Sequence, residues 1–189
     1  MKNYQAIIEK IDELLERQPQ VLVAIDGDCG GGKTTLAGYL KQLYDCNVLP
    51  MDYFFLSPEQ KTVERLNQPG GNVDYERFLT EVLTPLRAGQ AFTYRPYDCA
   101  TGNFGAEIEV PERKLSIVEG VYSLHPALAD AYHIKVFIGV TPDLQLQRII
   151  ERDGAEMLER FHEEWIPLEK HYLAYFNIEG RCDFVFREG

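Results

Sequence analysis

A glycine-rich stretch early in the chain has the residue types that hold phosphate groups. Residues 27–34 fit the pattern G-x-x-x-x-G-K-[ST], in which backbone N–H groups line a loop around phosphates, the lysine supplies a cation and the hydroxyl reaches Mg²⁺. The stretch follows an apolar run at 21–25 and precedes a helical pattern, which is the context that this loop requires. We therefore predict a nucleoside triphosphate site formed by Gly27, Asp28, Cys29, Gly30, Gly31, Gly32, Lys33, Thr34 and Thr35.

Two carboxylates end apolar runs that are predicted to be buried strands. Asp52 ends the run "NVLPMD" and Glu119 lies near the end of "LSIVEG", so both are expected at the carboxyl edge of a parallel sheet, where ligands bind. Phosphoryl transfer needs one carboxylate to orient and deprotonate an acceptor hydroxyl and another to hold the metal. Asp52 and Glu119 are the candidates, although an Asp that caps the next turn and a surface Glu are the ordinary alternatives.

Three arginines lie in the C-terminal part of the chain. Arg148 and Arg152 are four residues apart and share one face of a predicted helix, and Arg160 lies on the next helix. Together they would form a lid, at about 142–162, that covers the charge of a transferring phosphoryl group. Each arginine taken alone is explained equally well by pairing with a neighbouring glutamate such as Glu151.

Short apolar runs alternate with helical patterns along the chain, which is typical of a parallel sheet with helices on both faces. The predicted strands are 21–26, 47–52, 115–120 and 134–140, with a further candidate at 182–186. The predicted helices are 33–44, 75–87, 142–152 and 155–176, and residues 4–15 have the spacing of an amphipathic core helix. We predict a three-layer α/β fold and, in a chain of 189 residues without linkers or repeats, a single domain spanning 1–189.

Residues 91–110 do not follow this alternation. They are aromatic and polar, with a turn-forming Thr-Gly-Asn at 101–103, and they predict a β-hairpin beside the main sheet. Tyr97 and Asp98 lie on this hairpin. Judged alone, Tyr97 is more simply explained as an aromatic packed across the hairpin.

The composition disfavours several classes of partner. A formal net charge of -11 would repel nucleic acids and anionic membranes over most of the surface. No run approaches the roughly 20 apolar residues of a membrane span, and the N-terminal stretch does not have the features of a signal peptide. The four cysteines are scattered without metal or disulfide spacing, which favours reduced thiols in a cytoplasmic protein. A homo-oligomer is compatible with the sequence.

Six motifs, taken in order, resemble those of the uridine kinase family, which is related to phosphoribulokinase, nicotinamide riboside kinase and bacterial pantothenate kinase. They are Gly27–Thr35, Asp52–Phe55, Asn72–Asp74, Pro96–Asp98, Val118–Gly120 and Arg148–Asp153. The resemblance spans residues 21–187. It implies a P-loop NTPase-type fold with an acceptor-side hairpin and a short helical lid, and transfer of the γ-phosphoryl group of ATP to a hydroxyl of a nucleoside-like acceptor.

The resemblance also implies roles for residues around the phosphates. Asp52 would be the general base and would lie near the metal, while Thr34 and Glu119 would hold Mg²⁺. Arg148 and Arg152 would stabilise the transferring phosphoryl group, which agrees with the electrostatic demand of the reaction.

On the acceptor side, the resemblance implies that Asp74 hydrogen-bonds sugar hydroxyls and that Tyr97 lines the pocket. Asp74 and Asp98 form a carboxylate pair that suits hydroxyls whatever group they carry. The chain departs from the family pattern at Gly102, where uridine kinases have a histidine that reads the pyrimidine, and at Tyr75, where His-Pro is usual.

These departures leave the acceptor open. A nucleoside is the first expectation, followed by a sugar, pantothenate or nicotinamide riboside, and the competing class is a regulator that binds a nucleotide without turnover. The choice between ATP and GTP is open as well. Cys29 is either a small residue that fits the loop or a thiol whose pKa the loop amides lower, and His125 either caps the loop after Glu119 or faces the acceptor.

Overall fold

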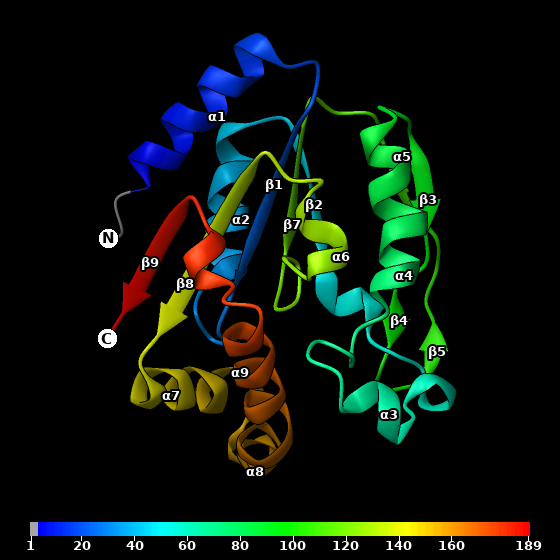
Figure 1. The fold of residues 1–189 in the computed structure, drawn as a ribbon, viewed down its shortest axis with the longest axis vertical. Coiled ribbons are helices and arrows are strands. Elements are labelled where there is room, and N and C mark those ends of the chain that lie inside the picture. Colours follow the sequence, from blue (N-terminus) through cyan, green and yellow to red (C-terminus); the bar gives the residue numbers. More distant parts are fainter. Residues whose placement is uncertain (1–3) are drawn as a thin grey trace.

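A five-stranded parallel sheet runs through the middle of the protein (Figure 1). The computed structural model describes residues 4–189. The strands are β1 (Val21–Gly27), β2 (Cys46–Pro50), β7 (Leu115–Glu119), β8 (Ile134–Val140) and β9 (Phe184–Glu188). Their order across the sheet is β2-β7-β1-β8-β9. The predicted α/β fold is confirmed.

Helices cover both faces of this sheet (Figure 1): α1 and α2 pack on one face, and α4, α5, α6 and α9 pack on the other. The helices are α1 (Gln5–Arg17), α2 (Lys33–Leu43), α3 (Val63–Leu66), α4 (Tyr75–Phe78), α5 (Thr84–Arg87), α6 (Pro126–Ala129), α7 (Pro142–Asp153), α8 (Leu158–Arg160) and α9 (Ile166–Tyr175). Short 3-10 turns lie at Met51–Phe54 (η1), Pro58–Gln60 (η2), Ala155–Met157 (η4) and Glu179–Arg181 (η6). No helix within residues 4–189 is long and apolar enough to cross a membrane.

Strand β1 lies at the centre of the sheet and contributes side chains to the two hydrophobic cores, one on each face of the sheet. Val21, Val23 and Ile25 pack with residues of α1 and α2, whereas Leu22 and Ala24 point to the core on the opposite face. Every residue of β1 is buried. A strand that is covered on both faces has no solvent side to carry polar residues, which explains its continuous apolar run.

Two long helical segments each contain a π turn that the sequence did not predict. The predicted helix 75–87 consists of α4, a π turn at Leu79–Leu83 (η3) and α5, and the predicted helix 155–176 contains a π turn at Phe161–Trp165 (η5) just before α9. A proline, Pro85 or Pro167, follows each π turn by two residues. Proline cannot donate an N–H to the preceding turn and its ring clashes with the carbonyl there, so a local widening of the helix relieves both problems.

Two predicted strand boundaries also differ. Strand β2 ends at Pro50, and the chain turns into η1 where the sequence predicted that the strand continues to Asp52. The last strand lies at Phe184–Glu188, two residues later than predicted.

Residues 92–110 form two short antiparallel pairs that lie apart from the main sheet, beside α4 and α5 (Figure 1). Strand β3 (Phe92–Tyr94) pairs with β6 (Ile108–Val110), and β4 (Tyr97–Asp98) pairs with β5 (Asn103–Phe104). The pairing register shifts by one residue between the two pairs, so they do not form one continuous ladder.

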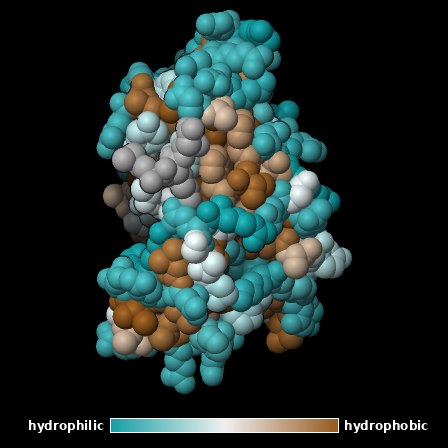
Figure 2. All heavy atoms as spheres, turned by 90° about the vertical axis from the view of Figure 1, so that its left-hand side faces the viewer, coloured by the Kyte–Doolittle hydropathy of each residue, from teal (hydrophilic) through white to brown (hydrophobic). Residues whose placement is uncertain are grey.

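The face that carries α1, α7 and β9 is mostly hydrophilic, with hydrophobic side chains exposed in separate areas (Figure 2). Ile150 of α7 and Val185 of β9 are among the exposed hydrophobic residues. Scattered exposure of this kind is normal for a globular protein.

A buried carboxylate at the end of β1 joins three parts of the fold. Asp26 has no exposed surface, and it accepts hydrogen bonds from the N–H of Gly27 at 2.6 Å, the N–H of Leu124 at 2.9 Å and the hydroxyl of Tyr172 at 2.7 Å. Burial raises the pKa of Asp26, and these hydrogen bonds oppose that rise. The contact with Tyr172 attaches α9 to the central strand.

Replacing Tyr172 with phenylalanine is expected to lower the free energy of unfolding by about 1–2 kcal/mol, because the buried Asp26 carboxylate loses a donor. Urea denaturation would measure the change. The control is Tyr175→Phe on the same helix, where the side chain is 68% exposed and the expected change is within about 0.5 kcal/mol. Equal stability of the two variants would show that the Tyr172 hydrogen bond does not hold α9.

Candidate active site

The glycine-rich loop lies between β1 and α2, at the carboxyl end of the sheet. A Cβ atom at Gly27 would overlap the carbonyl oxygen of Ile138, and its φ of 129° is unfavourable for other residues. Gly32 caps α2 in the left-handed region, with φ 94°. Glycine therefore allows the chain to pass close to β8 and then turn its N–H groups toward the start of the helix, as a phosphate-binding loop requires.

Lys33 spans the loop from inside. Its side chain is buried, and Nζ donates to the carbonyl oxygens of Gly27 at 2.9 Å and Asp28 at 2.8 Å. The ammonium group thus lies at the centre of the loop, where a bound phosphate would meet it.

Two carboxylates and a hydroxyl lie beside the loop. Thr34 Oγ1 donates to Glu119 at the end of β7, with both carboxylate oxygens at 3.2 Å. Asp52 reaches the same place from η1 and not, as predicted, from the end of a strand. A Cβ atom at Gly120 would lie 3.4 Å from Oδ1 of Asp52, so the glycine after Glu119 lets the two acidic segments approach.

The electrostatics of these two acids show that they lie close together. Burial raises the pKa of Glu119, and the charge of Asp52 raises it further, while Lys33 and the Thr34 hydrogen bond lower it. Burial also raises the pKa of Asp52, whereas the charges of Lys33 and Arg152 lower it. Two neighbouring carboxylates with a hydroxyl make an all-oxygen donor set, which fits a hard cation such as Mg²⁺.

The three arginines are brought to this side of the protein but already have partners. Arg148 donates to the carbonyl of Gly30 at 2.9 Å and pairs with Glu188 of β9. Arg152 donates to Asp153 at 2.8 Å. Arg160 donates to Glu164 at 3.1 Å and lies over the ring of Trp165.

The three arginines differ in the groups that they contact or act on. Arg148 contacts the loop itself, and the charge of Arg152 acts on Asp52 and Cys29. Arg160 acts electrostatically on Cys99 at the tip of the hairpin. Arg148 and Arg152 remain the predicted candidates for stabilising a transferring group.

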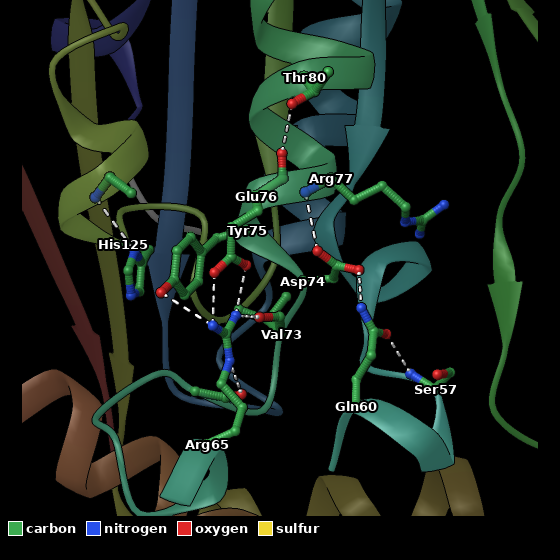
Figure 3. Close-up of polar contacts among 12 residues, drawn as sticks. Ser57, Gln60, Arg65, Val73, Asp74, Tyr75, Glu76, Arg77, Thr80 and His125 are labelled. Carbon is green, nitrogen blue, oxygen red and sulfur yellow. Dashed lines mark hydrogen bonds and ion pairs between the residues drawn. The ribbon is translucent and has the colours of Figure 1, made fainter. Parts of the chain in front are cut away.

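Asp74 occupies the start of α4, as Figure 3 shows. Its Oδ1 accepts from the backbone N–H of Arg77 at 3.0 Å, which makes Asp74 the N-cap, and its Oδ2 accepts from Gln60 at 2.8 Å. The cap holds the carboxylate in a fixed orientation, with lone pairs left on each oxygen for a further donor.

The two hairpin candidates have mainly local contacts. Tyr97 is buried, with its ring edge-on to Phe104 at 5.4 Å. Asp98 closes the turn, because its oxygens accept from the N–H of Ala100 at 2.8 Å and the hydroxyl of Thr101 at 3.0 Å. These bonds lower the pKa of Asp98 and account for it as a turn residue.

Arg77 is a residue that the sequence analysis missed. Its guanidinium donates to the carbonyl of Tyr53 at 2.7 Å and of Arg95 at 2.9 Å, and lies 4.1 Å from the ring centroid of Phe54. Arg77 therefore connects α4, the turn that carries Asp52 and the hairpin. These partners are far apart in sequence, so no local pattern marks the residue.

Cys29 is held from two helices outside the loop. Its backbone N–H donates to Glu169 of α9 at 3.2 Å, and its carbonyl accepts from Gln145 of α7 at 3.0 Å. Burial and the charge of Glu169 raise the pKa of the Cys29 thiol to about 12. The alternative in which loop amides lower this pKa is therefore wrong. Glu169 was also missed, because only the fold brings it to the loop.

Comparisons with known proteins agree with this arrangement. No family model matches the sequence. A uridine kinase of Staphylococcus aureus (strain JH9) is 26% identical over 189 aligned positions, covering 87% of this chain and 90% of that protein. Uridine kinase-like protein 4 of Arabidopsis thaliana is 30% identical over 153 positions. That match covers 76% of this chain and only 32% of the plant protein.

These similarities support the assignment of the chain to a uridine kinase-like family of P-loop kinases. A solved structure of a candidate fructose transport system kinase from Silicibacter sp. TM1040 has the same fold, with a TM-score of 0.72, 23% identity and coverage of 98% of this chain and 100% of that one. The similarity to these kinases supports an ATP-dependent kinase that phosphorylates a hydroxyl of a small molecule.

The segment after Asp74 is held by contacts of Tyr75 and Glu76. Tyr75 stacks on His125 with ring centroids 3.9 Å apart, and His125 accepts from the N–H of Ala127 and so caps α6. Arg65 donates to both carboxylate oxygens of Glu76 at 2.6 Å (Figure 3). Burial lowers the pKa of His125 to about 4. The histidine is thus a neutral structural residue. Of the two predicted roles, a cap after Glu119 or a residue that faces the acceptor, the structure supports the cap, which lies at the start of α6.

The cysteines should differ in reactivity. Cys99 is exposed on the hairpin, whereas Cys29 is buried and its high pKa leaves little thiolate. Iodoacetamide at pH 8 is expected to alkylate Cys99 about tenfold or more faster than Cys29, because alkylation requires an accessible thiolate. Peptide mass spectrometry over time would measure both rates, with the urea-unfolded protein as control. Equal rates in the folded protein would contradict the buried, protonated state of Cys29.

Proposed function

We propose that this protein transfers the γ-phosphoryl group of ATP to a hydroxyl of a nucleoside-like acceptor, with Asp52 as the general base. The observation that carries the proposal is the position of Asp52. Burial raises its pKa, and the positive charges of Lys33 and Arg152 oppose this rise. Its turn is joined to the hairpin through Arg77. A base so placed lies between the phosphate loop and the acceptor side, as proton removal from the acceptor requires.

The nucleotide side of this proposal uses the loop and the acidic cluster. Lys33 and the loop N–H groups would hold the phosphates. Thr34, Asp52 and Glu119 would hold Mg²⁺, which when bound supplies positive charge to the polyphosphate.

The arginines of the proposed lid, at 142–162, would act on the transferring group. Arg148 already contacts the loop at Gly30 and Arg152 acts on Asp52. Closure of this segment would exclude water and so suppress hydrolysis of ATP.

The acceptor side offers aromatic surface next to hydroxyl-binding groups. Tyr53, directly after Asp52, is 37% exposed and Phe104 on the hairpin is 45% exposed, and both contact Arg77. Exposed rings suit a planar ring system, which is why a nucleoside-like acceptor is preferred over a sugar or pantothenate. Nicotinamide riboside also carries a planar ring and stays the alternative that this surface accommodates. Asp74 and Tyr97 would bind the sugar portion, with Asp98 contributing through the turn it closes.

The first experiment is ADP release from Mg²⁺-ATP in the presence of uridine, cytidine, nicotinamide riboside, pantothenate and simple sugars. We expect one acceptor to stimulate release and Asp52→Asn to lower the stimulated rate about 100-fold or more, because the variant cannot take the proton. The variant should still bind ADP. Asp45→Asn, at an exposed position outside the site, is the control and should retain full activity.

The outcomes of this experiment separate the two classes. Loss of stimulated turnover in Asp52→Asn with retained nucleotide binding supports the kinase. Stimulated turnover that is unchanged in Asp52→Asn would exclude this residue as the base. Nucleotide binding by the natural chain without turnover of any acceptor would favour the regulator.

The metal site has a separate test. Glu119→Gln is expected to raise the Mg²⁺ concentration required for half-maximal activity by about tenfold, because one of the two carboxylates of the donor set is lost. Affinity for ADP without metal should stay within about twofold, since the loop donors remain. The control is Glu112→Gln, which changes an exposed residue. An unchanged Mg²⁺ requirement in Glu119→Gln would remove Glu119 from the metal site.

A further inference from the structure

Glu169 lies on α9 with its carboxylate against the phosphate loop. The residue is only 8% exposed, and Oε2 accepts from the backbone N–H of Cys29 at 3.2 Å. The same loop is expected to bind phosphates, which carry the same sign of charge as a glutamate. A buried acid at this position is therefore unfavourable for the ligand unless its charge is removed.

In the part of the chain that the structure describes, no cationic side chain directly contacts the carboxylate of Glu169. Within residues 4–189, no lysine or arginine forms an ion pair with it. Lys33 is near enough to favour the charged form, but its Nζ is directed to the carbonyls of Gly27 and Asp28. Burying a carboxylate that is not paired is costly, and such a group commonly becomes neutral by taking up a proton.

The titratable and charged groups that surround Glu169 come from the loop, from the segment after β7, and from β1, α7 and α9. They are Asp28, Cys29 and Lys33 on the loop side, Tyr122 after β7, Arg152 of α7, which acts on Cys29, and the Asp26–Tyr172 pair that joins β1 to α9. Burial raises the pKa of Glu169 to about 7, with Lys33 and the Cys29 hydrogen bond opposing it and Asp28 adding to it. The thiol of Cys29 and the phenol of Tyr122 have raised pKa values and stay neutral.

We infer that Glu169 is a positioning residue of the phosphate loop that takes up a proton from solvent when the phosphates of a nucleotide bind. This inference rests on the nucleotide binding of the proposed function, and it assigns Glu169 no part in the chemistry. In the neutral form the carbonyl oxygen still accepts from Cys29 N–H, so the loop keeps its conformation while the repulsive charge disappears.

The direction of the pH dependence follows from charge. Phosphates in the loop add negative charge near Glu169, which favours its protonated form and raises its pKa above the value in the free protein. Below pH 7 the residue is already largely protonated and binding has its full strength. As pH rises from 7 toward the higher pKa of the complex, affinity falls by up to about tenfold per pH unit.

The test is titration calorimetry with ADP and Mg²⁺ on the full chain at pH 6 and pH 8.5. Glu169→Gln imitates the neutral acid and keeps an oxygen for Cys29 N–H. It is expected to bind ADP within about twofold of the natural chain at pH 6 and about fivefold or more tighter at pH 8.5. Glu163→Gln, an exposed position on the same helical segment, is the matched control and should behave like the natural chain, so that titration of ADP itself cancels.

A second measurement needs no variant at residue 169. Calorimetry at pH 8 in two buffers with different ionisation enthalpies gives the number of protons taken up by the natural chain, at a pH where the phosphates of ADP are fully ionised. Net uptake supports the inference. Absence of uptake, or equal pH dependence in Glu169→Gln and Glu163→Gln, would overturn it while leaving nucleotide binding intact. Failure of the natural chain to bind ADP at pH 6 would instead overturn the proposed function, and this inference with it.

Discussion

The rest of the site depends on the hydrogen bonds that the buried carboxylate of Asp26 accepts. This carboxylate lies where β1 becomes the phosphate loop, and its three donors come from the loop, from the segment after β7 and from α9. A buried acid of this kind is stable only when its oxygens are hydrogen-bonded. The requirement to supply those donors fixes the start of the loop relative to α9, and α9 in turn carries Glu169 to Cys29.

The strands and the phosphate loop were predictable because their signals are local. A strand buried on both faces must be apolar throughout, and the loop needs glycine at fixed positions, as the overlap between a Cβ at Gly27 and Ile138 shows. The parallel sheet then places Glu119 beside the loop, since β1 and β7 are paired up to Ile25 and Glu119. Asp52 was assigned to the correct region but to the wrong element, because η1 replaces the end of the strand.

Long-range contacts were not predictable. Cys29 and Glu169 are 140 residues apart, and Arg77 and Tyr53 are 24 apart, so no periodicity or motif connects them. The π turns were not predicted for another reason. A proline indicates that a helix is interrupted, but it does not indicate whether the helix ends or widens into a π turn. The predicted acceptor-binding carboxylates also have local structural roles that the sequence analysis did not assign to them. Asp98 closes its own turn, and Asp74 caps α4.

Charge explains why the proposed nucleotide site would need both a metal and a neutral acid. The chain has a formal net charge of -11, and the charge of Lys33 acts on Asp26, Asp52, Glu119 and Glu169. Phosphates would be repelled by these acids if all were ionised. The backbone N–H groups of the loop keep their orientation whatever the protonation state. The acids nearest the phosphates would lose their repulsion in two ways: a cation would compensate Asp52 and Glu119, and a proton would neutralise Glu169. Affinity for the nucleotide would then come from donors that the fold fixes, and its dependence on metal and pH would come from the acids that surround them.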